Sequence, residues 1–411
     1  MSNENTRTQL PLSGVRVIEF GAGALEPTLV GFMADFGAEV IKVESRSKVD
    51  FIRLSEVAFL GDKRDPDQNG WFARYNQNKY SVLMNLQHPE GVALAKKLVS
   101  TGDIVTENFA TEIFHKLGLS YKELQKVKPD IIMLSASMGG QTGPYRDFRG
   151  HGSHMGVLLG VADLTGWPDR WPCSPGVAFS DHYTPYMYLI ILMAALEYRN
   201  RTGKGQFIDG SSIQGCLDIL DTAVADYGVN GRILHRQGNR HPAAAPHGVY
   251  RCQGDERWVA IAVFNDAEWQ GFCQAAGNPA WTSEARFSTL SGRLANVEEL
   301  DKLVEQWTLK YKAEDVMLRL QQSGVAAAVA ENAQDIYADP QLIARNHFWQ
   351  TDEPGMERYT FEDTPARLSK TPARYQRRFP KMGEHNDYVL HGLLGLSPEE
   401  IDRLVKEKIV F

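Results

Sequence analysis

The chain has 411 residues, of which 43% are apolar and 23% charged, so its composition is globular and excludes a disordered or collagen-like chain. At roughly 150 residues per domain, this length predicts two to three domains. The 44 basic and 51 acidic residues give a net charge of -7 without a long basic run, which argues against a nucleic-acid partner. Four cysteines without paired spacing indicate a reducing compartment.

No segment of the sequence is predicted to cross a membrane. The longest apolar run, at about 186–196, is shorter than the roughly 20 residues that a bilayer span needs. The first nine residues are polar and lack the apolar core of a signal peptide. We therefore expect a cytoplasmic protein with no membrane partner.

Strands and helices alternate in the first half of the chain. A strand over 15–20 leads through the turn Gly21-Ala22-Gly23 into a helix that ends near residue 36. The alternation continues with strands at 40–44, 103–107, 131–135 and 206–209 and helices at 89–100, 121–127 and 185–198. This order predicts an α/β fold with a parallel sheet and right-handed crossovers.

Three segments are expected along the chain. Residues 1–225 form the first part of a large domain, and residues 226–325 form a linker and a small α+β domain. The linker is indicated by a stretch rich in Gly, Pro, His and Arg. Residues 326–411 return to the large domain and end in a helix that begins at Ser397.

The first turn partly matches a dinucleotide-binding motif. Gly21 and Gly23 correspond to its first two glycines, and Glu44 ends the next strand about 20 residues later. Glu26 and Pro27 stand where the third glycine belongs, and an acidic side chain there would oppose a pyrophosphate. We expect a ligand at the carboxyl edge of the sheet, but not NAD.

Asp181 directly precedes the apolar segment 185–198. It can be a helix cap, or a carboxylate that serves as nucleophile or base beside an apolar wall. His151 and His154 in G-H-G-S-H are possible acid/base partners for it. This spacing matches no metal site, and no metal is predicted.

Several segments together resemble the family III CoA-transferases, also called the CaiB/BaiF family. The resemblance rests on G-A-E-V-I-K-V-E at 37–44, G-Q-T-G-P-Y at 140–145, R-T-G-K-G-Q-F-I-D at 201–209 and H-G-V-Y-R-C-Q-G-D at 247–255. It implies a Rossmann-like large domain built from both chain ends, a smaller α+β domain, and a dimer of two interlocked rings.

The same resemblance implies the residues of the site. Asp181 corresponds to the catalytic nucleophile, with His151 and Tyr183 near the substrate, and backbone N–H groups around Gly23 and Ala24 are candidate oxyanion donors. The residues expected to bind CoA are Gly23, Ala24, Met84, Asn85, Asn108, Phe109, Lys116 and Arg149. The CoA thioester is a substrate, and no tightly bound cofactor is expected.

The implied activity is CoA transfer from an acyl-CoA donor, with succinyl-CoA expected, to a carboxylic acid such as 2-benzylsuccinate. The intermediates are an aspartyl mixed anhydride and an aspartyl-CoA thioester. One alternative is a 2-methylacyl-CoA racemase that uses His151 and Asp181, although Gly152 replaces the Asp of its G-H-D segment. Another is a non-catalytic, CoA-binding subunit. The assembly is expected to be a homodimer or a heteromer with a sister subunit.

Overall fold

The structure is a computed structural model that describes residues 9–56, 58, 64–351 and 359–411. Its chain divides into two compact units. The large unit comprises Met1–Val161, Ser174–Arg232 and Ala344–Phe411, and the small unit comprises Ala162–Cys173 and Ile233–Ile343. Among the described residues, no helix has the length and apolar character needed to cross a membrane.

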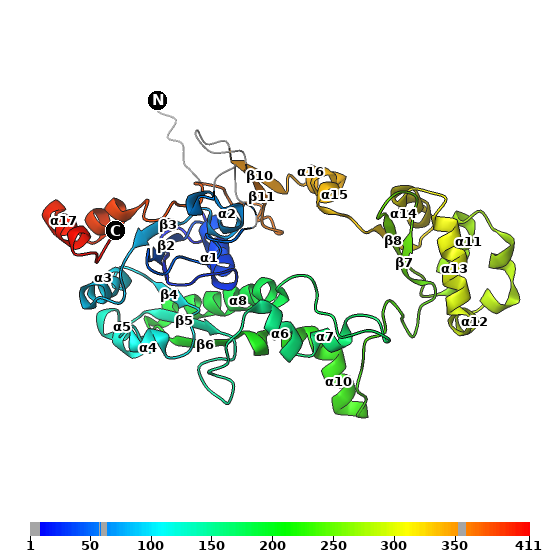
Figure 1. Ribbon diagram of the computed structural model, residues 1–411, viewed down its shortest axis with the longest axis horizontal. Helices are drawn as coiled ribbons and strands as arrows, with labels where there is room; N and C mark the ends of the chain where they lie inside the picture. The colour runs from blue at the N-terminus through cyan, green and yellow to red at the C-terminus, as the bar shows by residue number, and fades with distance from the viewer. Residues whose placement is uncertain (1–8, 57, 59–63, 352–358) are drawn as a thin grey trace. The chain divides into compact units, whose positions relative to one another are not determined.

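A six-stranded sheet, parallel throughout, forms the centre of the large unit (Figure 1). The order is β3-β2-β1-β4-β5-β6, which is the Rossmann order. Successive strands are added on one side of β1 up to β3 and on its other side from β4 onward, so the topological switch point lies between β1 and β4. The strands are β1 (Arg16–Glu19), β2 (Glu39–Glu44), β3 (Tyr80–Leu83), β4 (Ile104–Glu107), β5 (Ile132–Ser137) and β6 (Phe207–Ser211). The expected α/β fold with a parallel sheet is confirmed.

Helices bury both faces of this sheet, as parallel sheets require. On one face α1 (Leu25–Asp35) and α8 (Phe179–Thr202) pack against Val17 and Ile132. On the other, α3 (Pro89–Val99), α5 (Tyr121–Val127) and α17 (Pro398–Lys406) share a core with Ile18. Ser397 caps α17 by accepting from the N–H of Glu400 at 3.3 Å, as the sequence predicts.

Helix α8 differs from its prediction in two ways. It begins at Phe179, six residues before the expected start, and Pro185 lies inside it. Asp181 is therefore in the first turn and is not the N-cap, which is Ala178. Its apolar sequence also predicts a buried helix, but Ile190 and Ile191 are exposed on a face that no described residue covers.

The small unit contains an antiparallel sheet in the order β7-β8-β9. Its strands are β7 (His247–Arg251), β8 (Trp258–Ala262) and β9 (Ala326–Val329), and its main helices are α11 (Asp266–Ala275), α13 (Val297–Thr308) and α14 (Ala313–Gln322). Trp269, Phe272 and Trp307 fill the core between them. Because β9 pairs with β8, residues 326–343 group with this unit, although the sequence suggested a return to the large domain at 326.

Shorter elements complete both units. They are α2 (Gly70–Asn76), α4 (Ile113–Lys116), α6 (Gly152–Leu158), α7 (Val161–Leu164), α9 (Ser212–Gly215), α10 (Asp221–Asn230), α12 (Leu290–Ala295), α15 (Ala333–Ala338), α16 (Pro340–Ala344), β10 (Phe348–Thr351) and β11 (Tyr359–Glu362). The last two strands form an antiparallel pair in the returning segment of the large unit.

Candidate active site

A cavity of about 320 Å³ lies in the large unit, at the carboxyl ends of β1, β4 and β5. Open α/β sheets bind ligands at this edge, where the strand order reverses. The volume is at the lower end of the range for small-molecule sites. The lining residues are Ala22, Gly23, Ala24, Leu25, Phe51, Asn108, Phe109, Ala110, Ala136, Ser137, Met138, Gly150, His151, Met155, Asp181 and Ser212.

Side chains hold the turn after β1 from two sides. Ala22 donates its N–H to Oδ1 of Asn108 at 3.0 Å and accepts from Nδ2 of the same side chain at 2.7 Å. Gly23, whose φ of 83° is in the left-handed region that suits glycine, donates its N–H to Oδ1 of Asp50 at 3.2 Å. The N–H of Gly23 is therefore engaged within the protein, in contrast to its expected role as an oxyanion donor.

A buried lysine fixes the same turn from below. Nζ of Lys42 donates to the carbonyl of Gly21 at 2.6 Å, and it pairs with Glu19 at 3.2 Å and with Asp50 at 3.4 Å. Burial alone would lower the pKa of Lys42, but the carboxylates of Glu19 and Asp50 outweigh it and raise the pKa. The lysine thus stays charged. Lys42 binds the carbonyl of Gly21 and Asp50 binds the N–H of Gly23, so both glycines of the turn are fixed.

Glu26 packs against Gly21 of this turn and is not among the residues that line the cavity. It is fully buried, and a Cβ built on Gly21 would stand 1.3 Å from Oε2 of Glu26, so only glycine fits at that position. Burial, followed by the nearby carboxylate of Glu19, raises the pKa of Glu26 to about 8. The side chain is therefore mainly a neutral acid near pH 7 and does not present a negative charge to a ligand.

Asp181 reaches the cavity from the first turn of α8. Its carboxylate accepts from the hydroxyl of Ser180 at 3.4 Å and from the backbone N–H of Gly152. Burial raises the pKa of Asp181, while His182 and His151 oppose that shift. A half-buried carboxylate with few donors is more basic than a solvated one, which suits a nucleophile or a general base.

Of the three further site candidates from the sequence, His151 lines the cavity with Asp181, whereas His154 and Tyr183 do not. His151 lines the cavity as the residue before α6, and its ring centroid lies 4.4 Å from that of His154. Tyr183 stacks on Phe179 with centroids 5.9 Å apart, and it is not among the residues that line the cavity.

The residues expected to bind CoA separate into two groups. Gly23, Ala24, Asn108 and Phe109 line the cavity with Asp181. Met84 is fully buried in the core, and Asn85 holds the C-terminal segment through hydrogen bonds to Ile409 and Lys408. These two residues do not line the cavity, because the structure uses them to anchor the end of the chain.

Lys116 and Arg149 are exposed cations outside the cavity. Lys116 is the last residue of α4, and Arg149 directly precedes the lining residue Gly150. Neither side chain makes a hydrogen bond or ion pair with any residue that the structure describes. Both can therefore contact phosphate groups without breaking an existing interaction.

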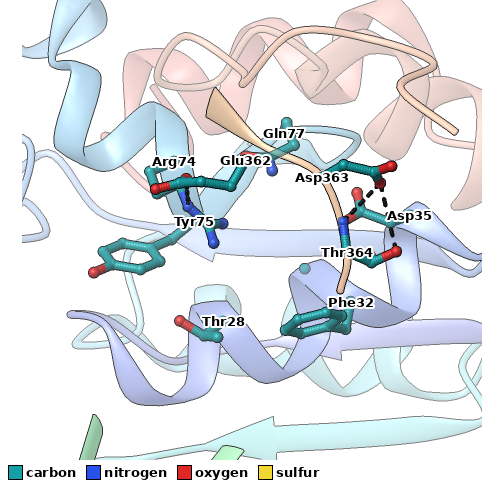
Figure 2. Close-up of a pocket in the computed structure, with 10 residues that line it drawn as sticks. Thr28, Phe32, Asp35, Arg74, Tyr75, Gln77, Glu362, Asp363 and Thr364 are labelled. Atoms are coloured by element: carbon teal, nitrogen blue, oxygen red, sulfur yellow. Dashed lines mark hydrogen bonds and ion pairs between the residues drawn. The ribbon is translucent and has the colours of Figure 1, made fainter. Parts of the chain in front are cut away.

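A second cavity lies along α1, where Thr28, Phe32 and Asp35 occupy successive turns (Figure 2). Figure 2 shows Arg74 of α2 paired with Glu362 of β11 beside it. Its volume of about 20 Å³ admits roughly one water molecule. It is too small for a CoA thioester, and its role is packing.

Sequence reasoning missed three contributors to the site. Ser137 is the last residue of β5, and Ser212 directly follows β6. Because ligands bind at the carboxyl ends of the strands in such sheets, these positions could have been predicted. Lys42 lies on β2 and meets the turn only through strand pairing. Within the described part of the chain, no group of three or more His, Cys, Asp or Glu side chains could hold a metal ion.

Comparison with known proteins identifies relatives over nearly the whole chain. The succinyl-CoA–D-citramalate CoA-transferase of Chloroflexus aurantiacus is 34% identical over 404 residues, covering 98% of this chain and 99% of that protein. The beta subunit of the succinyl-CoA–L-malate CoA-transferase of the same organism is 31% identical over 410 residues, covering 99% and 100%. A CaiB/BaiF family protein from Brucella suis has a crystal structure with a TM-score of 0.86 and 32% identity, covering 94% of this chain and 100% of that one.

The model of the family described as CoA-transferase family III matches residues 12–386, which include the first turn, Asp181 and the small unit. The resemblance expected from the sequence is thereby confirmed, and the protein is an enzyme that belongs to CoA-transferase family III.

Proposed function

We propose that this transferase moves CoA from succinyl-CoA to a dicarboxylic acid and that Asp181 is its nucleophile. The observation that carries the proposal is the half-buried carboxylate of Asp181 in the cavity at the carboxyl edge of the sheet. The named substrates of the two Chloroflexus relatives, citramalate and malate with succinyl-CoA, are all derived from short dicarboxylic acids. 2-Benzylsuccinate is also a dicarboxylic acid and stays a candidate acceptor.

The reaction needs four acyl substitutions, two at substrate carbonyls and two at the carbonyl of Asp181. Asp181 attacks the thioester carbonyl of succinyl-CoA, releases the CoA thiolate and forms a mixed anhydride. The thiolate attacks the aspartyl carbonyl, which releases succinate and leaves an aspartyl-CoA thioester. The acceptor carboxylate then displaces the thiolate to form a second anhydride. Finally, the thiolate attacks the acyl carbonyl of the acceptor and regenerates Asp181.

The chain's own groups fit these steps. The N–H of Gly152 orients the Asp181 carboxylate, and the N–H of Ala24 makes no hydrogen bond with any described residue of the protein. Ala24 precedes α1, whose N-terminal dipole favours negative charge. We assign the N–H of Ala24 to the developing oxyanions. Lys116 and Arg149 would contact the CoA phosphates.

Racemase chemistry fits the site less well. A Cβ on Gly152 would lie 2.5 Å from the Cβ of Ala178, so the aspartate that racemases carry there has no room beside Asp181.

A dimer or heteromer is also part of the proposal. The exposed apolar face of α8 supports it, and the malate relative is one subunit of a heteromeric enzyme by its name.

Mass spectrometry of the intact protein and its peptides tests the nucleophile. Incubation with succinyl-CoA should give an adduct on Asp181 that hydroxylamine converts to a hydroxamate. The variant Asp181→Ala should show no adduct and no transfer. Asp221→Ala is the matched control, because Asp221 also lies in the first turn of a helix but is exposed and outside the cavity.

An adduct at another residue, or transfer that survives in Asp181→Ala, would contradict the proposed nucleophile. CoA binding without any adduct would favour the non-catalytic subunit, and deuterium uptake at Cα of a 2-methylacyl-CoA would favour the racemase.

A further inference from the structure

Ser137 is a buried polar residue in the wall of the Asp181 cavity. It is the last residue of β5 and is 7% exposed. Its hydroxyl has no hydrogen-bond partner among the residues that the structure describes. A buried hydroxyl without a partner costs folding free energy, so its presence beside a ligand cavity points to a ligand atom as the partner. To meet such an atom, the hydroxyl would turn toward that cavity by rotation of χ1 between staggered rotamers.

The strand pairing places Ser137 beside β6. Ser137 pairs in register with Ser211 of β6, and the next residue, Ser212, also lines the cavity. The hydroxyl of Ser212 lies 3.4 Å from that of Tyr188. Tyr188 follows Asp181 by seven residues on α8, which is two helical turns or about 10 Å. Ser212 is therefore held beside the third turn of α8, whereas Asp181 lies in its first turn.

The electrostatic surroundings of the cavity suit an anion that neutral donors bind. No Lys or Arg belongs to the lining of the cavity within the described ranges. The first turn of α1, an 11-residue helix, contributes Leu25 to the wall, and its N-terminal dipole favours negative charge. His151 is the remaining basic side chain in the lining.

We propose that Ser137 is a specificity residue whose hydroxyl donates a hydrogen bond to the distal carboxylate of a dicarboxylic acyl group. The inference rests on the transferase function proposed above. It adds the residue by which the cavity recognises the second carboxylate of the substrate. A site built to hydrogen-bond a substrate group discriminates against an analogue that lacks the group.

The test compares two donors that differ only at their far end, succinyl-CoA and butyryl-CoA. The single-turnover rate of Asp181 acylation is measured for each with the wild type and with Ser137→Ala. We expect the variant to slow acylation by succinyl-CoA about tenfold to a hundredfold, which corresponds to a lost hydrogen bond to a charged group. Acylation by butyryl-CoA should change by less than about threefold.

Thermal unfolding distinguishes a ligand-binding role of Ser137 from a structural one, because loss of a structural hydrogen bond would lower the melting temperature. Because Ser137→Ala removes an unpaired buried hydroxyl, its melting temperature should equal or exceed that of the wild type. Ser81→Ala is the matched control, since this buried serine on β3 donates to Glu44 at 2.6 Å and lies outside the cavity. It should lower the melting temperature and leave the ratio of the two donor rates unchanged. Ser137→Cys, a near-isosteric variant with a weak donor, should give an intermediate ratio.

Equal slowing of both donors by Ser137→Ala would place the contact at the reacting carbonyl and overturn the inference, and so would no slowing of either. A wild type that reacts with butyryl-CoA as fast as with succinyl-CoA would also overturn it while leaving the transferase function intact. A wild type that no thioester acylates would remove the proposed function and this inference together.

Discussion

The backbone of Gly152 lies directly against the carboxylate of Asp181. A Cβ built on Gly152 would stand 2.8 Å from Cγ and Oδ2 of Asp181 and 2.5 Å from the Cβ of Ala178, the cap of α8. Even the smallest side chain would therefore push the first turns of α6 and α8 apart. The close approach brings the N–H of Gly152 to the carboxylate and sets its direction.

We accordingly expect Gly152→Ala to reduce the rate of Asp181 acylation by at least about tenfold, and to destabilise the fold by roughly 1–3 kcal/mol through overpacking. Rapid-quench mass spectrometry and urea unfolding measure the two effects. Gly228→Ala in α10 is the control, because a Cβ there meets nothing within 4 Å. Full activity in Gly152→Ala would contradict the orienting role of this contact.

The pH dependence of acylation should report the ionisation of Asp181. Because burial raises its pKa, the attacking carboxylate becomes available only at a higher pH than an ordinary aspartate requires. The acylation rate should therefore rise with pH along an acid limb. His151→Gln removes one of the groups that oppose the shift, so the limb should move to higher pH.

His115→Gln is the control for this shift, since His115 is exposed on α4 and outside the cavity. An acid limb that stays in place, or moves to lower pH, in His151→Gln would show that His151 does not act on the carboxylate.

Lys116 and Arg149 should affect binding and not chemistry. Both are exposed and outside the cavity, so Lys116→Ala and Arg149→Ala are expected to raise KM for succinyl-CoA about threefold to tenfold with little change in kcat. Steady-state kinetics at two salt concentrations measure this, because screening weakens exposed phosphate contacts. A fall in kcat at unchanged KM would contradict the assignment.

The main elements of the fold could be predicted because buried parallel strands are continuous apolar runs between helix signals. This holds for β1, β2, β4 and β5. Strand β3 is not predicted, because Tyr80 and Ser81 interrupt its apolar run. The start of α8 is misplaced because Pro185 is typical of a first helical turn, whereas here the helix tolerates it in its seventh position.

The candidate site was predictable only in part, for a related reason. Asp181 and the first turn stand out in the sequence, but their supports come from remote segments. The contact between Asn108 and Ala22 spans 86 positions and arises because β1 and β4 are neighbours in the sheet. Lys42 is buried on β2, but the sequence of this strand does not show which group its ammonium contacts. Such contacts follow from strand order, which local patterns do not encode.

Lys42 should matter for both stability and activity, and the two effects can be separated. Lys42→Met leaves Asp50 buried without its cation, which typically costs about 3–5 kcal/mol, and removes the donor to the carbonyl of Gly21. Urea unfolding should show this loss, and acylation of Asp181 should slow. In the double variant Lys42→Met/Asp50→Asn the unpaired charge is gone, while an amide oxygen still accepts from Gly23.

We expect the double variant to regain much of the stability but not the acylation rate, because the carbonyl of Gly21 still lacks its donor. Recovery of both would show that Lys42 contributes to stability alone and does not position the turn.

Glu26 makes a prediction about stability as a function of pH. In the unfolded chain its pKa is near 4.5, and in the folded protein burial raises it to about 8. Between these values the unfolded state releases a proton that the folded state keeps, so the free energy of unfolding decreases as pH rises from about 4.5 to about 8. Asp35 and Glu107, whose pKa values burial raises to about 7, act in the same direction.

Glu26→Gln keeps the shape of the side chain and removes the ionisation. The variant should match the wild type near pH 5 and should be more stable at pH 8.5, with a melting temperature several degrees higher. Its stability should still decline with pH, less steeply, because Asp35 and Glu107 remain. Thermal unfolding at half-unit steps from pH 5 to 9 measures both slopes. Parallel curves for the two proteins would mean that Glu26 is ionised in the folded protein. The buried lysines Lys42 and Lys79, which both pair with Glu19, would then also balance the charge of Glu26.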